Sequence, residues 1–543
     1  MRMPHRIQRW IGLPILLLLV TSAWYVTAIC WETPIWQHPD DYPAHSLGHA
    51  MNLEESLETG KRFQNPGLGA HPGIPFFISS WIAFKGAQWS QTGLNKTDSN
   101  GDISWRTLQH PERFWFFNKL VALILALLGT AAIWLFASAY GAGTAFICGL
   151  IYYSLSSVSW THSFSYLTND SFALLLAGGF GLIARPALRR NRGGAFYWWV
   201  LWGFWCGCGY LVKLNYLALF FGALTGLGVA WSTGRFGFLE AVKKGGLLFL
   251  GIASAMVCGI AIIGWASFIN LLQTHFLFAA HTKLYGSGDM GILSFHEMWS
   301  AFVRAAADPF LVLAIALVVI VCIGVISRGW KDTDTAESES PLLAAMAAII
   351  ILSFLAALKH YAPHYTLITS ASIAVAAAML VGRSKRKLWR GGVLAFCVVA
   401  LLTSTFWRAK DQFETRHQAA IAALADRDQI LSLPINPGEY RLWTYRAPMP
   451  EFRMGFAVIY SGVDRLITKL REAEAKGFDR SSYINRTPQF PWRYIILEKL
   501  HYNSLQAVRK LDFYQPTDRL IELETVIVID RTNGDRLQPW PGL

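Results

Sequence analysis

The sequence predicts an α-helical polytopic membrane protein with about eleven transmembrane helices and a small C-terminal α/β domain. Three observations predict this fold class. The 543 residues are 53% hydrophobic and only 15% charged, whereas soluble domains are about one-quarter charged. Apolar runs long enough to cross about 30 Å of hydrocarbon recur through the first four hundred residues. Basic residues gather in short loops between these runs, as they do in membrane proteins.

Each apolar run is expected to be helical, because backbone groups without hydrogen bonds are costly in lipid. The runs predict helices near 11–30, 117–138, 142–157, 170–184, 195–211, 215–231, 247–266, 309–326, 342–358, 365–381 and 392–407. The first run starts like a signal peptide, but Ala28 to Glu32 form a poor cleavage site, so we expect it to be retained. The transmembrane domain is therefore predicted to span 1–407.

The basic loops orient the chain. Loops on the N-terminal side carry Arg185, Arg189, Arg190, Arg192, Arg235, Lys243, Lys244, Arg383, Lys385, Arg386, Lys387 and Arg390. The positive-inside rule places these loops and the N-terminus in the cytoplasm. The loop 327–341 departs from the pattern because acids outnumber its basic residues, but acids count little in this rule. The segments expected outside are 31–116, 158–169, 267–308, 359–364 and 408–543.

Composition also excludes several function classes. The net charge of +13 is explained by loops that orient the chain, so we expect no nucleic-acid partner. All seven cysteines fall inside apolar runs, and no outer segment has a pair that would form a disulfide or ligate zinc. No internal repeat is evident, which weighs against an inverted-repeat transporter. No redox centre or nucleotide-binding fold is visible.

Two acidic sites are predicted to face the outside. Asp40 and Asp41 follow the first helix, ahead of a polar stretch with helical spacing (44–63), and Asp170 starts the fourth helix. A carboxylate near the membrane surface can accept a proton from an incoming nucleophile. The alternative for Asp40 and Asp41 is a solvated loop, and for Asn169 or Asp170 it is a helix cap. Their shared side favours a common function.

Cationic and aromatic residues are expected on the same side. Lys213 lies in an otherwise apolar neighbourhood between helices five and six, where an ionisable residue indicates function and an anionic partner. Snorkelling to the interface is the alternative. The turn after helix nine holds Lys359, His360, Tyr361, His364 and Tyr365, groups that suit a phosphate, with an interfacial aromatic belt as the alternative.

Three further patterns are interpreted as turns or connections. His71, Pro72 and Pro75 predict a rigid turn before an interfacial or re-entrant helix through Trp81. Gly286, Gly288 and Gly291 predict a mobile connection in the loop 267–308 that is able to close over a site. The run "DSNGD" at 98–102 resembles part of a calcium loop but lacks the acid at its far end, so we interpret it as a turn.

Residues 408–543 predict a small α/β domain. A polar helix pattern covers Lys410 to Ser432, and an amphipathic helix pattern covers Val463 to Lys476. Strand patterns occur in "YRLWTYR" (440–446), "RYIILEK" (493–499) and the alternating run "LIELETVIVID" (520–530).

Taken together, the first four hundred residues resemble the GT-C class of membrane glycosyltransferases, in particular protein O-mannosyltransferases and the lipid A aminoarabinose transferase. The resembling motifs occur in order: Asp40 and Asp41, a polar helix, "HPGIP" at 71–75, Asp170, "GCGYLVK" ending at Lys213, and "KHYAPHYTLITSASIAVAA" from Lys359. Two positions depart from the family pattern. The common Asp-Glu pair is Asp-Asp here, and the usual second proline is Gly73.

The resemblance implies inverting transfer of a hexose or pentose from a polyprenyl-phosphate carrier to a lipid, glycan or protein. It implies that Asp41 or Asp40 is the general base and that Asp170 assists or orients the acceptor. Lys213, His71, Lys359, His360, His364 and Tyr365 are then expected to bind the donor phosphate or substrate. No cofactor is expected, although a divalent metal is optional in the class. The implied location is a bacterial inner membrane, with the C-terminal domain in the periplasm.

Two other function classes are compatible with the pattern. A transporter or flippase of lipid-linked sugars would use the same cationic and aromatic groups without a base. A membrane scaffold whose outer domain binds a partner would make the acids dispensable.

Overall fold

The computed structural model describes the following residues: 5–25, 28, 46, 49–50, 53–54, 56–58, 60, 73–92, 111–155, 167–188, 196–280, 291, 295–306, 309–327, 339–359, 363–383, 430–433, 443–444, 494–498, 505–509, 516–522 and 526–530. The chain divides into two compact units. One comprises Met1–Cys30, Leu68–Phe77 and Lys119–Phe406, and the other comprises Trp31–Gly67, Ile78–Asn118 and Trp407–Leu543. Each unit is described by itself.

The first unit is helical. Its helices are α1 (His5–Trp24), α6 (Ala142–Leu155), α8 (Ala173–Ala187), α9 (Phe196–Val212), α10 (Ala218–Ser232), α11 (Phe238–Ile263), α12 (Trp265–Ala280), α13 (Phe295–Ala305), α14 (Pro309–Ser327), α15 (Ser340–Lys359) and α16 (Leu367–Arg383). Helices α3 (Ile74–Thr92) and α5 (Pro111–Ser138) each belong partly to both units. Ten of the eleven predicted transmembrane segments are confirmed as helices, and the eleventh, 392–407, lies outside the described residues.

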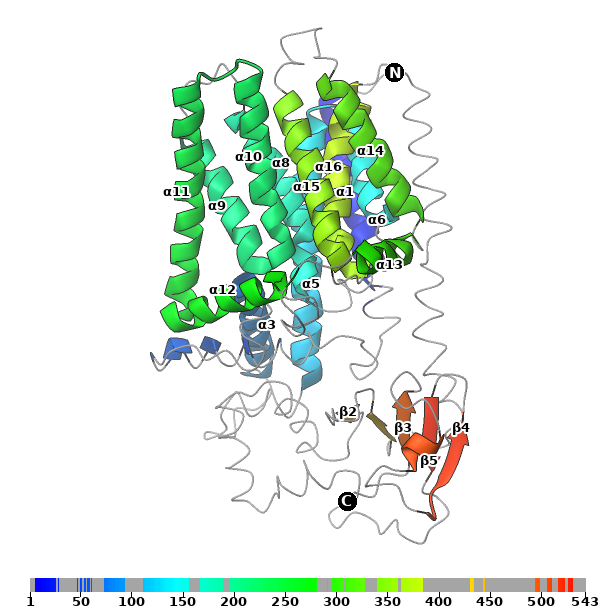
Figure 1. Ribbon diagram of the computed structural model, residues 1–543. Coiled ribbons are helices and arrows are strands. Elements are labelled where there is room, and N and C mark those ends of the chain that lie inside the picture. The colour runs from blue at the N-terminus through cyan, green and yellow to red at the C-terminus, as the bar shows by residue number, and fades with distance from the viewer. Residues whose placement is uncertain are drawn as a thin grey trace. The chain divides into compact units, whose positions relative to one another are not determined.

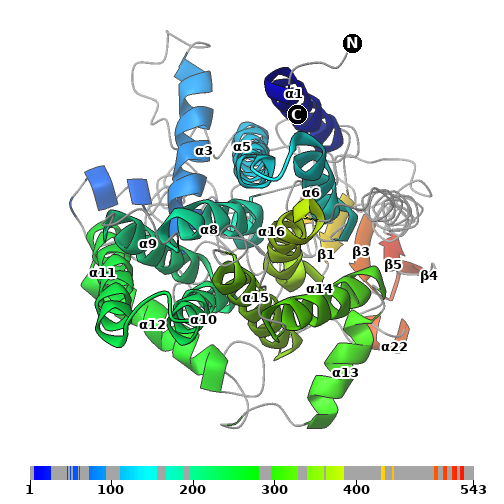
Figure 2. The ribbon, with the colours of Figure 1, turned by 90° about the horizontal axis from the view of Figure 1, so that it is seen from above.

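The helices identify a multi-pass membrane protein. Within the described part of the chain, five stretches are long and apolar enough to cross a membrane: Arg113–Ser138, Leu214–Ser232, Phe238–Ile263, Ser340–Lys359 and His364–Val381. Figure 1 shows α9, α10, α11, α15 and α16 upright, with α12 crossing the lower end of α9, α10 and α11. The view from above places α15 between α10 and α14, both of which it contacts (Figure 2).

Small residues allow α9 and α11 to pack closely. A Cβ added at Gly203 of α9 would lie 1.9 Å from the Leu248 carbonyl oxygen, and one at Gly251 of α11 would lie 2.0 Å from the Val200 carbonyl oxygen. Gly207 likewise faces Ala255. Lipid is as apolar as leucine, so helices in a membrane associate through close packing of small residues. The approach of these two backbones therefore depends on glycine.

A glycine also redirects the chain at the end of α11. Gly264 has φ 78° and ψ 159°, a conformation that is essentially restricted to glycine, and α12 starts at the next residue. The interpretation of 267–308 as a loop is partly wrong, because α12 and α13 occupy much of that range. The mobile connection at its glycines stays a prediction. Buried Phe268 and Leu271 of α12 explain why it is ordered. Gly286 and Gly288 lie outside the described residues.

The predicted polar helix of the first outer segment is confirmed in the second unit. The described residues between 46 and 58 are helical, and their buried members are Ser46, His49, Ala50, Leu53 and Glu54. This spacing places them on one helical face. Hydrogen bonds join Ser46 to Ser80 (2.8 Å) and to Asn118 (2.7 Å), so the polar helix is held against residues of α3 and α5.

The described C-terminal residues of this unit form a five-stranded mixed sheet. Its strands are β1 (Ile430–Leu433), β2 (Trp443–Thr444), β3 (Tyr494–Glu498), β4 (Arg519–Glu522) and β5 (Val526–Asp530), in the order β2-β1-β3-β5-β4, with a short helix α22 (Leu505–Val508). Among the described strands, β1 and β3 pair in parallel, and the other pairs are antiparallel.

Two predictions for this domain need correction. The helix expected up to Ser432 is wrong at its end, because Ile430–Leu433 is a short apolar run paired with both β2 and β3. The single alternating run at 520–530 contains two antiparallel strands, β4 and β5. The amphipathic helix predicted at Val463–Lys476 lies outside the described residues.

We predict that Gly203→Ala lowers the thermal stability of the purified protein in detergent. The new methyl group would overlap the Leu248 carbonyl, and overpacking of this kind costs about 1–3 kcal/mol. Gly246→Ala is the matched control, because a Cβ at Gly246 of α11 would meet nothing within 4 Å. Equal melting temperatures for both variants would show that α9 and α11 are not closely packed.

Candidate functional site

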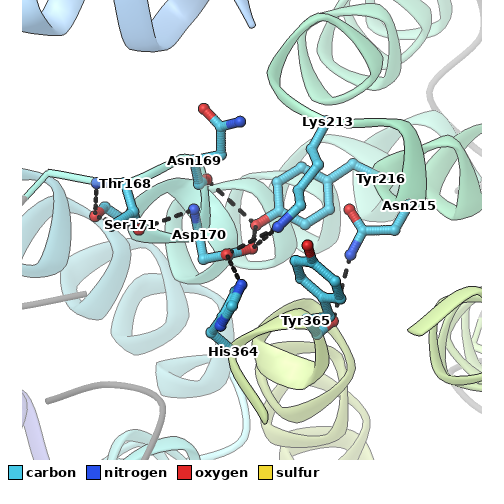
Figure 3. Close-up of polar contacts among 9 residues, drawn as sticks. All are labelled: Thr168, Asn169, Asp170, Ser171, Lys213, Asn215, Tyr216, His364 and Tyr365. Carbon is cyan, nitrogen blue, oxygen red and sulfur yellow. Dashed lines mark hydrogen bonds and ion pairs between the residues drawn. The ribbon is translucent and has the colours of Figure 1, made fainter. Parts of the chain in front are cut away.

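Three short 3₁₀ turns bring polar residues together inside the apolar helical unit. The turns are η3 (Asn169–Phe172) before α8, η4 (Leu214–Leu217) before α10, and η6 (Pro363–Thr366) before α16. Figure 3 shows Lys213, Tyr216 of η4 and His364 of η6 pointing toward Asp170 of η3. Each turn directly precedes a helix, so the site lies where these three helices begin.

A buried ion pair is the centre of this site. Lys213 Nζ lies 3.0 Å from Asp170 Oδ2 and 3.2 Å from Oδ1, and the two side chains are 8% and 1% exposed. The Tyr216 hydroxyl donates to Asp170 Oδ1 at 3.3 Å, with the Asn169 carbonyl an alternative acceptor at 3.4 Å. Asp170 thus accepts hydrogen bonds from two residues of the same turn, because Lys213 is the N-cap residue of η4 and Tyr216 lies within η4.

The helix cap expected at Asn169 or Asp170 is instead supplied by Thr168. Its hydroxyl accepts from the Asp170 amide at 3.2 Å, and its own amide donates to the Ser171 hydroxyl at 3.0 Å. This capping box satisfies backbone groups at the start of η3. The Asp170 carboxylate therefore points to Lys213.

The third turn covers the ion pair with aromatic residues. Lys213 Nζ lies 3.9 Å from the centroid of the Tyr365 ring, a cation–π distance. His364 Nε2 is 4.0 Å from Asp170 Oδ2, and the His364 ring packs edge-on against Tyr365. The Asn215 amide donates to the Tyr365 carbonyl at 3.3 Å and so joins η4 to η6.

The arrangement brings together four of the residues predicted from the sequence, namely Asp170, Lys213, His364 and Tyr365. Lys359 has a different contact, since its ammonium group donates to the Ala279 carbonyl near the end of α12. Asp40, Asp41, His71 and His360 lie outside the described residues, so their predicted roles stay predictions.

Sequence reasoning missed Tyr216 and Asn215. Both follow Lys213 within three residues in the run "KLNY". Their polar groups interrupt an otherwise apolar segment, which was an available signal that Lys213 has local partners.

The far end of α8 carries a second, separate ion pair. Arg185 in its last turn lies 3.7 Å from Glu339, next to the start of α15, and its guanidinium lies 4.9 Å from the Tyr140 ring centroid. Arg185 is one of the basic residues that predicted a cytoplasmic loop. Arg185 and the Asp170 site thus lie at opposite ends of α8.

In the second unit, Glu54 fixes the polar helix to α3. Its buried carboxylate accepts a hydrogen bond from Trp81 Nε1 at 2.5 Å and one from the Lys85 ammonium group. Burial raises the pKa of Glu54, but the hydrogen bonds from Lys85 and Trp81 together with the Lys85 charge outweigh it, so the pKa lies below its usual value. Glu54 is therefore ionised at neutral pH.

A metal site was left open by the sequence. Within the described ranges, no three histidine, cysteine, aspartate or glutamate side chains gather as potential metal ligands.

Comparisons with known proteins identify structural neighbours only. No family model and no curated protein matches the chain. The structure is similar to the crystal structure of ArnT from Cupriavidus metallidurans bound to undecaprenyl phosphate, with 12% identity, a TM-score of 0.46, and coverage of 96% of this chain and 97% of that chain. It is also similar to the apo form, with 12% identity, a TM-score of 0.44, and coverage of 95% and 97%. ArnT is the lipid A aminoarabinose transferase.

We predict that Asp170→Asn and Lys213→Met each lower stability strongly, and that the double variant is less destabilised than their sum. Removing one member of a buried ion pair costs about 3–5 kcal/mol because the other charge stays buried. A double-mutant cycle on thermal unfolding in detergent measures this coupling. Additive effects would mean that the two side chains do not interact in the folded protein.

We predict that Glu54 makes stability sensitive to acid. A carboxyl whose folded pKa lies below its unfolded value, here 4.5, stabilises the fold above that value and loses this contribution as pH falls through the folded pKa. The melting temperature of Glu54→Gln should therefore fall less than that of wild type between about pH 5 and about pH 3. Glu240→Gln is the control, because Glu240 is 53% exposed in its pair with Lys244. An acid response of Glu54→Gln equal to that of wild type would contradict the assignment.

Proposed function

We propose that this protein is an inverting glycosyltransferase that moves a sugar from a polyprenyl-phosphate carrier to an acceptor at the outer face of a bacterial inner membrane. The observation that carries the proposal is the buried Asp170–Lys213 pair with its His364 and Tyr365 neighbours, set at the ends of apolar helices. Ionisable residues at membrane depth are costly and are typically functional.

Lys213 and His364 are suited to hold the carrier phosphate. Lys213 offers an ammonium group and His364 a ring nitrogen, both adjacent to the same carboxylate. Charge-assisted hydrogen bonds to phosphate are stronger than neutral ones. In an apolar site, such donors would stabilise the negative charge that builds on the phosphate as it leaves.

Asp170 is assigned a different role from Asp40 and Asp41. Asp170 is 1% exposed and accepts from Lys213 and Tyr216, so we assign it to orienting Lys213 and the acceptor. Proton removal from the acceptor is assigned to Asp41 or Asp40, as the family resemblance implies. Both Asp170 oxygens already accept hydrogen bonds from Lys213, whereas a general base must lie within hydrogen-bonding reach of the proton that it removes.

The chemistry requires little else from the protein. A sugar on a lipid phosphate is already activated, so the enzyme must position the acceptor, take one proton and stabilise the departing phosphate. The donor is a hexose or pentose carrier lipid, and the acceptor is a lipid, glycan or protein. In this proposal the N-terminus is cytoplasmic, and the C-terminal domain is periplasmic.

We predict that most sugar transfer by the purified protein in nanodiscs is lost in two kinds of single variant. One is Asp41→Asn or Asp40→Asn, and the other is Lys213→Met. The substrates are polyprenyl-phosphate hexoses or pentoses and candidate acceptors, and release of polyprenyl phosphate is the readout. Loss of a general base lowers the rate by about 10²–10⁴-fold. Glu240→Gln, on the exposed face of α11, is the control.

Two outcomes would overturn the proposal. One is unchanged transfer in the Asp40, Asp41 and Lys213 variants. The other is the absence of sugar–phosphate cleavage with any donor, while intact lipid-linked sugar changes leaflets in vesicles. The second result would identify a transporter.

A further inference from the structure

Gly73 packs against the end of α9 at a distance that no side chain permits. A Cβ at Gly73 would lie 1.9 Å from the Leu211 carbonyl oxygen and 2.5 Å from the Val212 carbonyl oxygen. Gly73 is buried, and its φ is not among the positive glycine φ values. Glycine is therefore needed here for space and not for backbone conformation.

The backbone that Gly73 touches leads directly into Lys213. The Lys213 amide makes the last bond of α9, to the Gly209 carbonyl at 3.2 Å. Lys213 itself is extended, with φ −164° and ψ 147°, and its side chain then reaches Asp170. The carbonyls of Leu211 and Val212 belong to the last turn of α9. A shift of this turn would move Lys213.

Hydrogen bonds and packing hold the segment at Gly73 in place. Gly73 caps α3, since its carbonyl accepts from the amides of Phe76 at 3.0 Å and Phe77 at 3.2 Å. The next residue, Ile74, is 1% exposed. A Cβ at Gly259 of α11 would lie 2.9 Å from Ile74 Cδ1 and 3.3 Å from Leu211 Cδ1. Ile74 and Leu211 thus both pack against Gly259 of α11. This packing holds the start of α3 against α9.

We propose that Gly73 is a positioning residue that sets Lys213 for phosphate binding. It acts through close backbone contact with Leu211 and Val212, and a side chain at position 73 displaces the last turn of α9. The proposal rests on the proposed function of Lys213 as a phosphate ligand. It assigns a mechanical role to the third residue of the His-Pro-Gly motif.

The test compares Gly73→Ala with two other glycine variants of the full-length protein in nanodiscs. The probe is undecaprenyl phosphate without sugar, and dissociation constant and melting temperature are both measured. A displaced Lys213 would lose its charge-assisted hydrogen bond to the phosphate. We therefore expect Gly73→Ala to weaken binding of undecaprenyl phosphate by about tenfold or more.

The two controls separate positioning from general instability. A Cβ at Gly207, on the face of α9 toward α11, would lie 2.6 Å from the Ala255 Cβ, and one at Gly228 of α10 would meet nothing within 4 Å. Gly207→Ala should lower the melting temperature with binding within about twofold of wild type. Gly228→Ala should change neither. If Gly73→Ala and Gly207→Ala weaken binding equally, the loss of binding by Gly73→Ala is explained by general instability. That result would overturn the proposal.

Lys213→Met distinguishes failure of this inference from failure of the proposed function. If Lys213→Met binds undecaprenyl phosphate like wild type, the proposed function fails. If Lys213→Met loses binding and Gly73→Ala retains it, the positioning role of Gly73 is wrong.

Should Gly73→Ala not fold, Ile74→Ala loosens the packing between the start of α3 and α9 without adding a side chain. We then expect weaker binding by Ile74→Ala, and wild-type affinity would contradict the proposal.

Discussion

The ion pair between Asp170 and Lys213 is the interaction on which the arrangement of the helical unit depends. Two charges buried among apolar helices are tolerated only when each satisfies the other. Satisfying them here requires that the turns before α8, α10 and α16 meet, because Tyr216 and Tyr365 complete the surroundings of the pair. The polar site therefore dictates where these three helices begin.

Close backbone packing makes that convergence possible. Helices in lipid gain no hydrophobic free energy from one another, so small residues decide how near they come. Gly203 and Gly251 bring α9 against α11, and Gly73 brings the start of α3 against the end of α9. Lys213 leaves α9 at this crowded end. Packing that stabilises the fold thus also limits where the cation lies.

Much of this fold was predictable from the sequence, because apolar runs long enough for a membrane have few alternatives to helix. Lys213 was predictable as a charge that the lipid would otherwise disfavour, Asp170 as an acid on the outer side, and His364 as a group suited to phosphate. Their pairing was not, because it depends on contacts between segments 43 and 194 positions apart along the chain (170 to 213 and 170 to 364). The cap at Thr168 was missed because neighbouring polar residues offer the backbone several local partners. The strand β1 was missed because a short, largely apolar run fits a helix or a strand.

The central claim is that Lys213 binds the carrier phosphate at the site formed by the three turns. Cryo-electron microscopy of the wild-type protein in nanodiscs with undecaprenyl phosphate tests it most directly. We expect phosphate density within hydrogen-bonding distance of Lys213 Nζ and beside His364, with the lipid tail running along the apolar helices. Phosphate density away from Lys213, with the Asp170–Lys213 pair unchanged, would contradict the claim.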